Sequence, residues 1–113
     1  MAGWIGVDLD GTLAHYDKWR GVYHIGKPVQ PMVDRIKKWL KEGREVRIVT
    51  ARVASKNERD NFVARDVIYQ WLRVTELPPL PIQCAKDFDM IELWDDRAVQ
   101  VIPNTGERAD GRE

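Results

Sequence analysis

Short apolar segments alternate with segments of helical periodicity along this chain, and this alternation restricts the possible fold more than any other feature. Strands are predicted over four segments: Trp4–Leu9, Glu45–Thr50, Leu80–Cys84 and Ile91–Trp94. A helix is predicted to begin at Pro31 and to end at Gly43, and a second helix to end at the LPPLP segment. Strands that alternate with helices indicate right-handed crossovers and a parallel sheet. The expected fold class is therefore α/β, a single-domain Rossmann-like parallel sheet flanked by helices.

Local signals refine this outline. Ser55, followed three residues later by Glu58, predicts a capping box at the start of the second helix. The apolar side of that helix is expected to consist of Phe62, Val63, Val67, Trp71 and Leu72. Val99–Ile102 is a candidate for a fifth short strand. Residues 1–103 are expected to form the domain, with a flap (a long loop or small hairpin) at residues 13–28, and residues 104–113 are expected to be a loose tail.

Composition excludes several classes of protein. The 113 residues carry 18 Lys plus Arg and 18 Asp plus Glu, and this balance excludes a generic polyanion binder. No apolar run approaches the ~20 residues that span a bilayer, so no membrane association is expected. The N-terminus lacks the pattern of a signal peptide, and one cysteine cannot form an internal disulfide. These features predict a cytoplasmic protein and leave its oligomeric state open.

Polar and charged residues follow each predicted strand directly. They are the run Asp8-Leu9-Asp10-Gly11-Thr12, then Thr50-Ala51-Arg52, then Lys86, and finally Asp95-Asp96. In a parallel sheet these clusters meet beyond the carboxyl ends of the strands, where ligands bind. Carboxylates crowded into one crevice repel each other, and a hard divalent cation such as Mg²⁺ relieves that repulsion. The same edge offers Thr50, Arg52, Lys86 and the Gly11–Thr12 amides to a phosphate group.

This set of motifs resembles the haloacid dehalogenase superfamily of phosphotransferases, in a capless form, over roughly residues 3–102. The resemblance implies that Asp8 is the nucleophile, which forms an aspartyl-phosphate, and that Asp10 is the general acid/base. It implies that Thr50 and Lys86 bind the phosphoryl group. It also implies that Mg²⁺ is held by Asp8, the Asp10 carbonyl and the pair Asp95 and Asp96, with Asp96 favoured as the inner ligand.

A narrower resemblance links the chain to the 3′-phosphatase domain of phage-type polynucleotide kinase/phosphatases. It is carried by Arg20-Gly21-x-Tyr23, Gln30-Pro31-Met32-Val33, Arg52, the Trp71 region, Pro81-x-Gln83-Cys84 and Asp95-Asp96-Arg97. It implies that Arg52 binds phosphate. The chain departs from that family because it has no kinase domain and because only Ala85–Met90 separates the third and fourth strands, where the family has a helix near its lysine.

The expected function is a Mg²⁺-dependent hydrolysis of phosphate monoesters. The expected substrate is a phosphorylated small molecule or a nucleic-acid end, with a nucleotide or nucleic-acid 3′-phosphate as the narrower hypothesis. Two alternatives stay open at this point. One is a non-catalytic or degenerate module that binds Mg²⁺, phosphate or a partner, and the other is a small-metabolite phosphatase.

Overall fold

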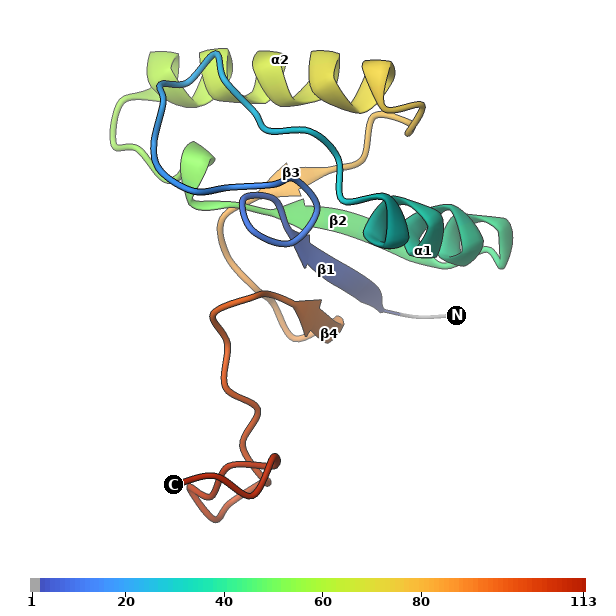
Figure 1. Cartoon of the computed structure of the whole chain (residues 1–113), viewed down its shortest axis with the longest axis vertical. Helices are drawn as coiled ribbons and strands as arrows, with labels where there is room; N and C mark the ends of the chain where they lie inside the picture. Colours follow the sequence, from blue (N-terminus) through green and yellow to red (C-terminus); the bar gives the residue numbers. More distant parts are fainter. Residues whose placement is uncertain (1–2) are drawn as a thin grey trace.

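A computed structural model describes residues 3–113 and contains one four-stranded parallel sheet (Figure 1). The strands are β1 (Trp4–Asp8), β2 (Glu45–Val49), β3 (Ile82–Gln83) and β4 (Met90–Trp94), and their order in the sheet is β3-β2-β1-β4. The helices are α1 (Gln30–Lys41) and α2 (Glu58–Val74), with a short 3₁₀ turn, η1, at Ala51–Val53. The predicted α/β, Rossmann-like architecture is confirmed.

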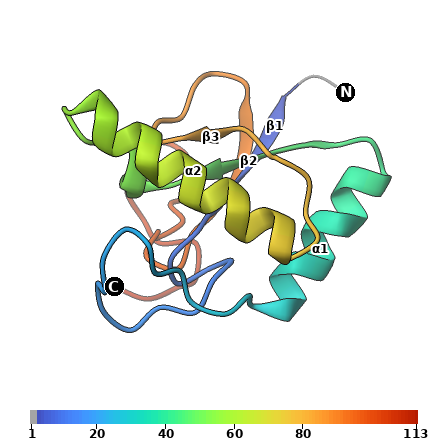
Figure 2. The ribbon, with the colours of Figure 1, turned by 90° about the horizontal axis from the view of Figure 1, so that it is seen from above.

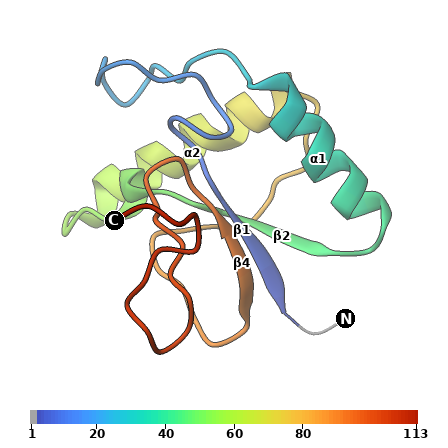
Figure 3. The same ribbon diagram turned by 60° about the horizontal axis from the view of Figure 1, so that its bottom comes forward.

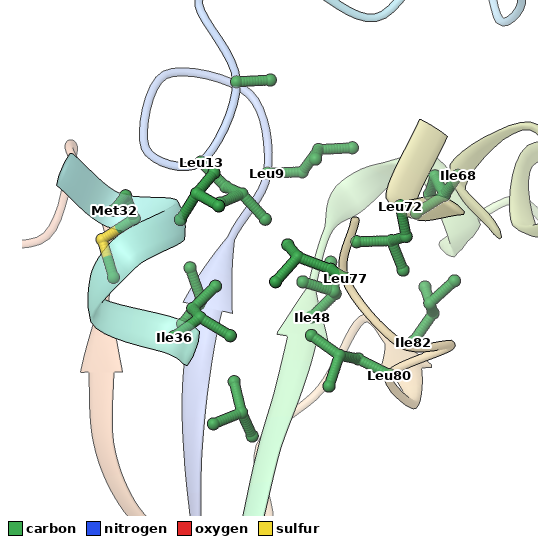
Figure 4. Close-up of a cluster of buried hydrophobic side chains, with 14 of the residues drawn as sticks. Leu9, Leu13, Met32, Ile36, Ile48, Ile68, Leu72, Leu77, Leu80 and Ile82 are labelled. Carbon is green, nitrogen blue, oxygen red and sulfur yellow. The ribbon is translucent and has the colours of Figure 1, made fainter. Parts of the chain in front are cut away.

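Both helices pack against the same face of the sheet, as the view from above shows (Figure 2). Side chains alternate along a strand, so Ile5 and Val7 of β1 point to this face, beside Val46 and Ile48 of β2. All four are buried in one cluster with apolar side chains of α1 and α2. Figure 4 shows Ile48 of this set between Ile36 of α1 and Leu72 of α2. This core fixes the height at which β1 and β2 end, and therefore the position of the polar residues that follow them.

The helix boundaries differ in detail from the sequence-based expectations. Pro31 lies in the first turn of α1, as predicted. The predicted capping box at Ser55 is wrong, because α2 begins two residues later and its N-cap is Asn57, which accepts hydrogen bonds from two backbone N–H groups. The predicted apolar side of α2 is correct only in part. Leu72 is buried and Trp71 packs against the core, as predicted, whereas Phe62 is exposed. The other buried residues of this helix are Asn61, Ala64 and Ile68.

Within the described residues the C-terminal segment adds no fifth strand to the sheet, and residues 104–113 contribute nothing to the buried core. Val101 pairs with Arg108 in an isolated antiparallel bridge, and backbone hydrogen bonds join Ile102 to Glu107 and Ala109 to Gln100. Residues 99–110, called the C-terminal hairpin below, extend away from the sheet on the side opposite α2 (Figure 1). Val99–Ile102 therefore pairs with its own following segment instead of the sheet.

The second face of the sheet has no helix among the described residues. The chain returns from β3 to β4 as an extended segment, which crosses this face. The Trp4 indole N–H donates a hydrogen bond to Asp87 Oδ1, in this segment, at 2.8 Å. The Arg47 guanidinium lies 4.6 Å from the Trp4 ring centre on the same side. Seen with the lower side of the molecule brought forward, β4 and the C-terminal hairpin dominate this face (Figure 3).

Candidate active site

Three carboxylates meet where β1 and β4 end side by side. Asp8 ends β1, and Asp95 and Asp96 follow β4, and each offers an oxygen within 4.8 Å of the others. Partial burial, a hydrogen bond with Asp96 and the charges of Asp95 and Asp96 raise the pKa of Asp8 from 3.8 to about 7. A proton shared with Asp96 or a divalent cation would relieve this repulsion. The donor set is made of oxygens alone, which fits Mg²⁺.

The Gly11–Thr12 turn fixes Asp96 against the end of β1. The Thr12 hydroxyl donates to Asp96 Oδ1 at 3.2 Å and accepts from the Asp96 backbone N–H at 3.1 Å. Gly11 has a φ of +93°, and a Cβ there would lie 2.5 Å from Asp96 Oδ2. A side chain at position 11 would therefore displace the carboxylate, and glycine is needed for both reasons.

Asp10 lies apart from this triad and pairs with Arg52. The guanidinium donates two hydrogen bonds to the carboxylate, Nε to Oδ2 at 2.7 Å and Nη2 to Oδ1 at 2.9 Å. The Arg52 side chain is only 6% exposed and that of Asp10 20%. Sequence analysis assigned Arg52 to the phosphate, but here its fork is occupied by the predicted general acid/base.

Arg52 also holds the flap. Its Nη1 and Nη2 groups donate to the backbone carbonyls of Val22 and His24, and its guanidinium lies 4.8 Å from the centre of the Trp19 ring. The flap is closed at its base by Ala14 and Pro28 and is tied to α2 where the Trp71 indole N–H donates to the Gly26 carbonyl. One arginine therefore joins Asp10 to the segment that overhangs the site.

A cavity of about 670 Å³ opens between the strand ends and the flap. Its walls include five residues that the sequence predicted for the site: Asp8, Asp10, Thr50, Arg52 and Asp95. Thr50 is buried, and its hydroxyl accepts the Arg52 backbone N–H at the start of η1. A volume of this size is typical of sites for small molecules and cofactors.

The structure separates Lys86 from this cavity. Lys86 is exposed on the extended segment between β3 and β4 and is not among the residues that line the walls, whereas Cys84, two residues earlier, is. Among the described residues, Lys86 has no carboxylate within ion-pair distance. The missing helix explains this position, because the extended segment must run back along the sheet to start β4.

The walls also include Tyr16, Cys84 and Arg97, to which the sequence pattern assigned no role. Arg97 is the most relevant, because it brings a second cation to the walls and its side chain has no ion-pair partner among the described residues. Its backbone N–H donates to Asp95 Oδ1 at 2.7 Å, so the turn after β4 fixes its position. The signal available in the sequence was its place directly after the acidic pair.

Comparison with known proteins gives information on the fold alone. No known protein family and no curated protein matches the chain. A solved structure of a conserved protein from Bacteroides thetaiotaomicron is similar, with a TM-score of 0.61 and 20% identity over 92% of this chain and 84% of that one. No helix in the described part of the chain has the length and apolar character needed to cross a membrane.

Proposed function

We propose that this protein is a Mg²⁺-dependent phosphate monoester hydrolase that works through an aspartyl-phosphate. The observation that carries the proposal is the acidic triad at the sheet edge, beside a cavity that also holds Asp10 and Thr50. The sequence resemblance to haloacid dehalogenase phosphotransferases assigns the same residues to this chemistry. A cytoplasmic location belongs to the same proposal, since the one cysteine, Cys84, is free.

In the first step an Asp8 oxygen attacks phosphorus, the bond from phosphorus to the alcohol oxygen breaks, and Asp10 gives the departing oxygen its proton. In the second step Asp10 takes a proton from water, and the resulting hydroxide attacks phosphorus. This attack releases inorganic phosphate and restores the Asp8 carboxylate. Asp10 returns to its protonated form with each cycle, so atoms and charge balance.

Mg²⁺ would be held by Asp8, the Asp10 carbonyl, Asp95 and Asp96, and its charge would offset that of the phosphoryl oxygens. The Thr50 hydroxyl supplies a neutral donor for the phosphate. The Gly11 and Thr12 amides, which the sequence also predicted for this role, donate instead to the Ala14 and Leu9 carbonyls within the turn. Because Arg52 is engaged by Asp10 and Lys86 lies off the cavity, Arg97 is the cation available to the phosphate. The bidentate pair also means that one Arg52 hydrogen bond must open before Asp10 reaches a substrate.

The substrate proposed is a nucleotide or a nucleic-acid end that carries a 3′-phosphate. Trp19 lines the cavity, its ring is 56% exposed, and Arg52 lies against it. A ring supported in this way can stack on a terminal base. The chain has no net charge, so recognition should be limited to the last one or two nucleotides, with a weak dependence on salt.

Two alternatives have their own support. The occupied carboxylate of Asp10 favours a module that binds Mg²⁺ or phosphate without turnover, and the cavity volume also suits a small-metabolite phosphatase. The deciding experiment is a screen of sugar phosphates, nucleotides and 3′- or 5′-phosphorylated oligonucleotides, with Mg²⁺, with Ca²⁺ and in EDTA. Release of phosphate with Mg²⁺ alone supports the proposal. Full release in EDTA, or binding without release for every substrate, contradicts it.

The acidic pair gives a second arm to this experiment. Asp96 contacts Asp8 directly and Asp95 lines the cavity, and we favour Asp96 as the inner Mg²⁺ ligand. Asp96→Ala should therefore raise the Mg²⁺ concentration needed for activity more than Asp95→Ala does. If both substitutions raised the required Mg²⁺ concentration equally, the assignment of Asp96 as the inner ligand would be contradicted.

A further inference from the structure

Exposed apolar side chains are concentrated near the end of the chain. Of the eleven large apolar residues that are exposed among the described residues, six lie between positions 88 and 102: Phe88, Ile91, Leu93, Val99, Val101 and Ile102. These residues belong to the loop before β4, to β4 itself and to the C-terminal hairpin. Scattered apolar residues are normal on a protein surface, whereas a contiguous apolar patch marks an interaction site.

The β4 part of this surface lies on the helix-free face of the sheet. Leu93 is beside Gly6, and a Cβ built on Gly6 would meet side-chain atoms of Val49, Trp4 and Leu93. The extended segment after β3 reaches Trp4 but leaves the next strand open, so Ile91 is 48% and Leu93 38% exposed. We call the side chains of Ile91 and Leu93 the β4 face. Because β4 is also an edge strand, it combines an open face with an unpaired edge, which folded proteins usually protect.

The C-terminal hairpin needs a surface to pack on. Within the described chain the buried core and the side chains that pack against it include no residue after Trp94. A two-stranded hairpin alone is only marginally stable in water. The hairpin residues Val99 and Val101 are each 48% exposed although the β4 face of the same chain is also open, so neither surface is fully covered within one chain.

The chain exposes more surface than a compact monomer of its mass, and the excess is large enough for an interface of standard size. The chain exposes 7977 Å², whereas a compact monomer of its mass exposes about 6,400 Å². Its radius of gyration is 14.8 Å, against about 13 Å for a compact chain of this length. The excess of roughly 1,600 Å² exceeds the ~800 Å² that each partner buries in a standard interface. With 18 positive and 18 negative side chains, two copies would also approach without net repulsion.

We infer that a second copy of this chain covers this surface, with the C-terminal hairpin of each copy on the β4 face of the other. A two-fold dimer of this kind is closed, because each copy contributes the same two surfaces and receives the same two. Neither the β4 face nor the C-terminal hairpin contributes a residue to the lining of the candidate active site. The inference is therefore independent of the proposed function.

The test measures mass in solution by light scattering during gel filtration. Interfaces of this size reach micromolar affinity or better, so at about 50 µM the native chain should have about twice its 13.1 kDa mass. Leu93→Glu and Val101→Glu should each weaken association about a hundredfold, because each buries a charge in the apolar contact. Val74→Glu is the matched control. Val74 is exposed on α2, away from the proposed contact, and its variant should remain dimeric.

Two further measurements keep the inference falsifiable. Far-UV circular dichroism checks that each variant is folded. A mixture of the Leu93 and Val101 variants retains one intact hairpin-to-β4 contact, so its average mass should exceed that of either variant alone. A monomeric native chain at about 50 µM, a dimer that survives both substitutions, or a mixture that stays monomeric would each overturn the exchange of hairpins.

Discussion

Arg52 and Asp10, 42 positions apart in the sequence, form a two-pronged ion pair under the flap, with hydrogen bonds of 2.7 and 2.9 Å. The same guanidinium donates to two flap carbonyls and lies against the Trp19 ring. The position of the predicted general acid/base is thereby coupled to the position of the flap. In the proposed function Arg52 is a positioning residue for Asp10.

Replacing Arg52 should therefore affect the acid step more than substrate binding. Arg52→Lys keeps the charge but loses the fork, and kcat should fall about tenfold to a hundredfold with little change in KM. The loss should be larger for an alkyl phosphate than for an aryl phosphate with a good leaving group, since the latter needs less help from an acid. Equal losses for both, with a large rise in KM, would instead place Arg52 on the phosphate.

Removing the whole side chain tests the structural part of the same contact. Arg52→Ala leaves the Asp10 carboxylate partly buried without its partner and should lower the free energy of unfolding by about 3 kcal/mol. Urea unfolding of the Arg52→Ala and Arg52→Lys chains measures this, and the lysine variant should lose less.

The raised pKa of Asp8 predicts a dependence of stability on pH in EDTA. An aspartate whose pKa rises from 3.8 to about 7 on folding favours the folded state only while it is protonated. Its contribution is complete below pH 3.8 and is lost as the pH rises to about 7. Asp8→Asn resembles the protonated form, so at about pH 8 it should be more stable than the native chain by on the order of 1–2 kcal/mol, after allowance for solvent screening.

Urea unfolding of the native and Asp8→Asn chains near pH 3.8 and at about pH 8 checks the sign of this stability difference. The two chains should differ little near pH 3.8. Mg²⁺ should stabilise the native chain at about pH 8 more than the variant, because it favours the ionised carboxylate. Phosphatase activity of Asp8→Asn should be absent, since an amide cannot form the acyl-phosphate. A variant less stable than the native chain at about pH 8, or activity within tenfold of native, would contradict the assignment of Asp8.

Arg97 and Lys86 can be compared directly as phosphate-binding cations. Arg97 lines the cavity and Lys86 does not, so Arg97→Ala should lower kcat/KM about a hundredfold and Lys86→Ala less than about threefold. Inorganic phosphate should inhibit the Lys86 variant as it does the native chain and the Arg97 variant much less. A larger loss of kcat/KM in Lys86→Ala than in Arg97→Ala would show that Lys86 binds the phosphate. The segment after β3 would then have to move toward the cavity.

Trp19 tests the proposed substrate class, with Tyr23 as its control. Trp19 lines the cavity, while Tyr23 lies on the same flap, is 79% exposed and does not line it. Trp19→Ala should raise KM for a 3′-phosphorylated nucleotide about tenfold, from the loss of one base stack, and Tyr23→Ala should leave it unchanged. KM for a sugar phosphate should not change in either variant. A tenfold preference for sugar phosphates in the native chain would favour the small-metabolite alternative.

The registers of α2 and of the C-terminal segment show why local patterns predicted only part of the fold. The prediction for α2 included Phe62, which is exposed, and omitted Ala64 and Ile68, which lie on the buried side. Close packing of a helix on a sheet favours a small residue at the contact, and hydrophobicity alone does not encode that geometry. Val99–Ile102 has strand-forming residues, yet its pairing partner is set by the chain that follows.

The sequence alone determined the alternation of strands and helices, and with it a parallel sheet. Apolar periodicity defines the elements, and parallel strands bring their carboxyl ends to one edge. The tertiary structure decided that β4 pairs with β1, and this strand order brings Asp95 and Asp96 to Asp8. Only the tertiary structure decided that Arg52 pairs with Asp10, that Arg97 lines the cavity and that Lys86 does not. These outcomes depend on the paths of irregular segments and on side-chain directions, which long-range packing fixes and no local pattern records.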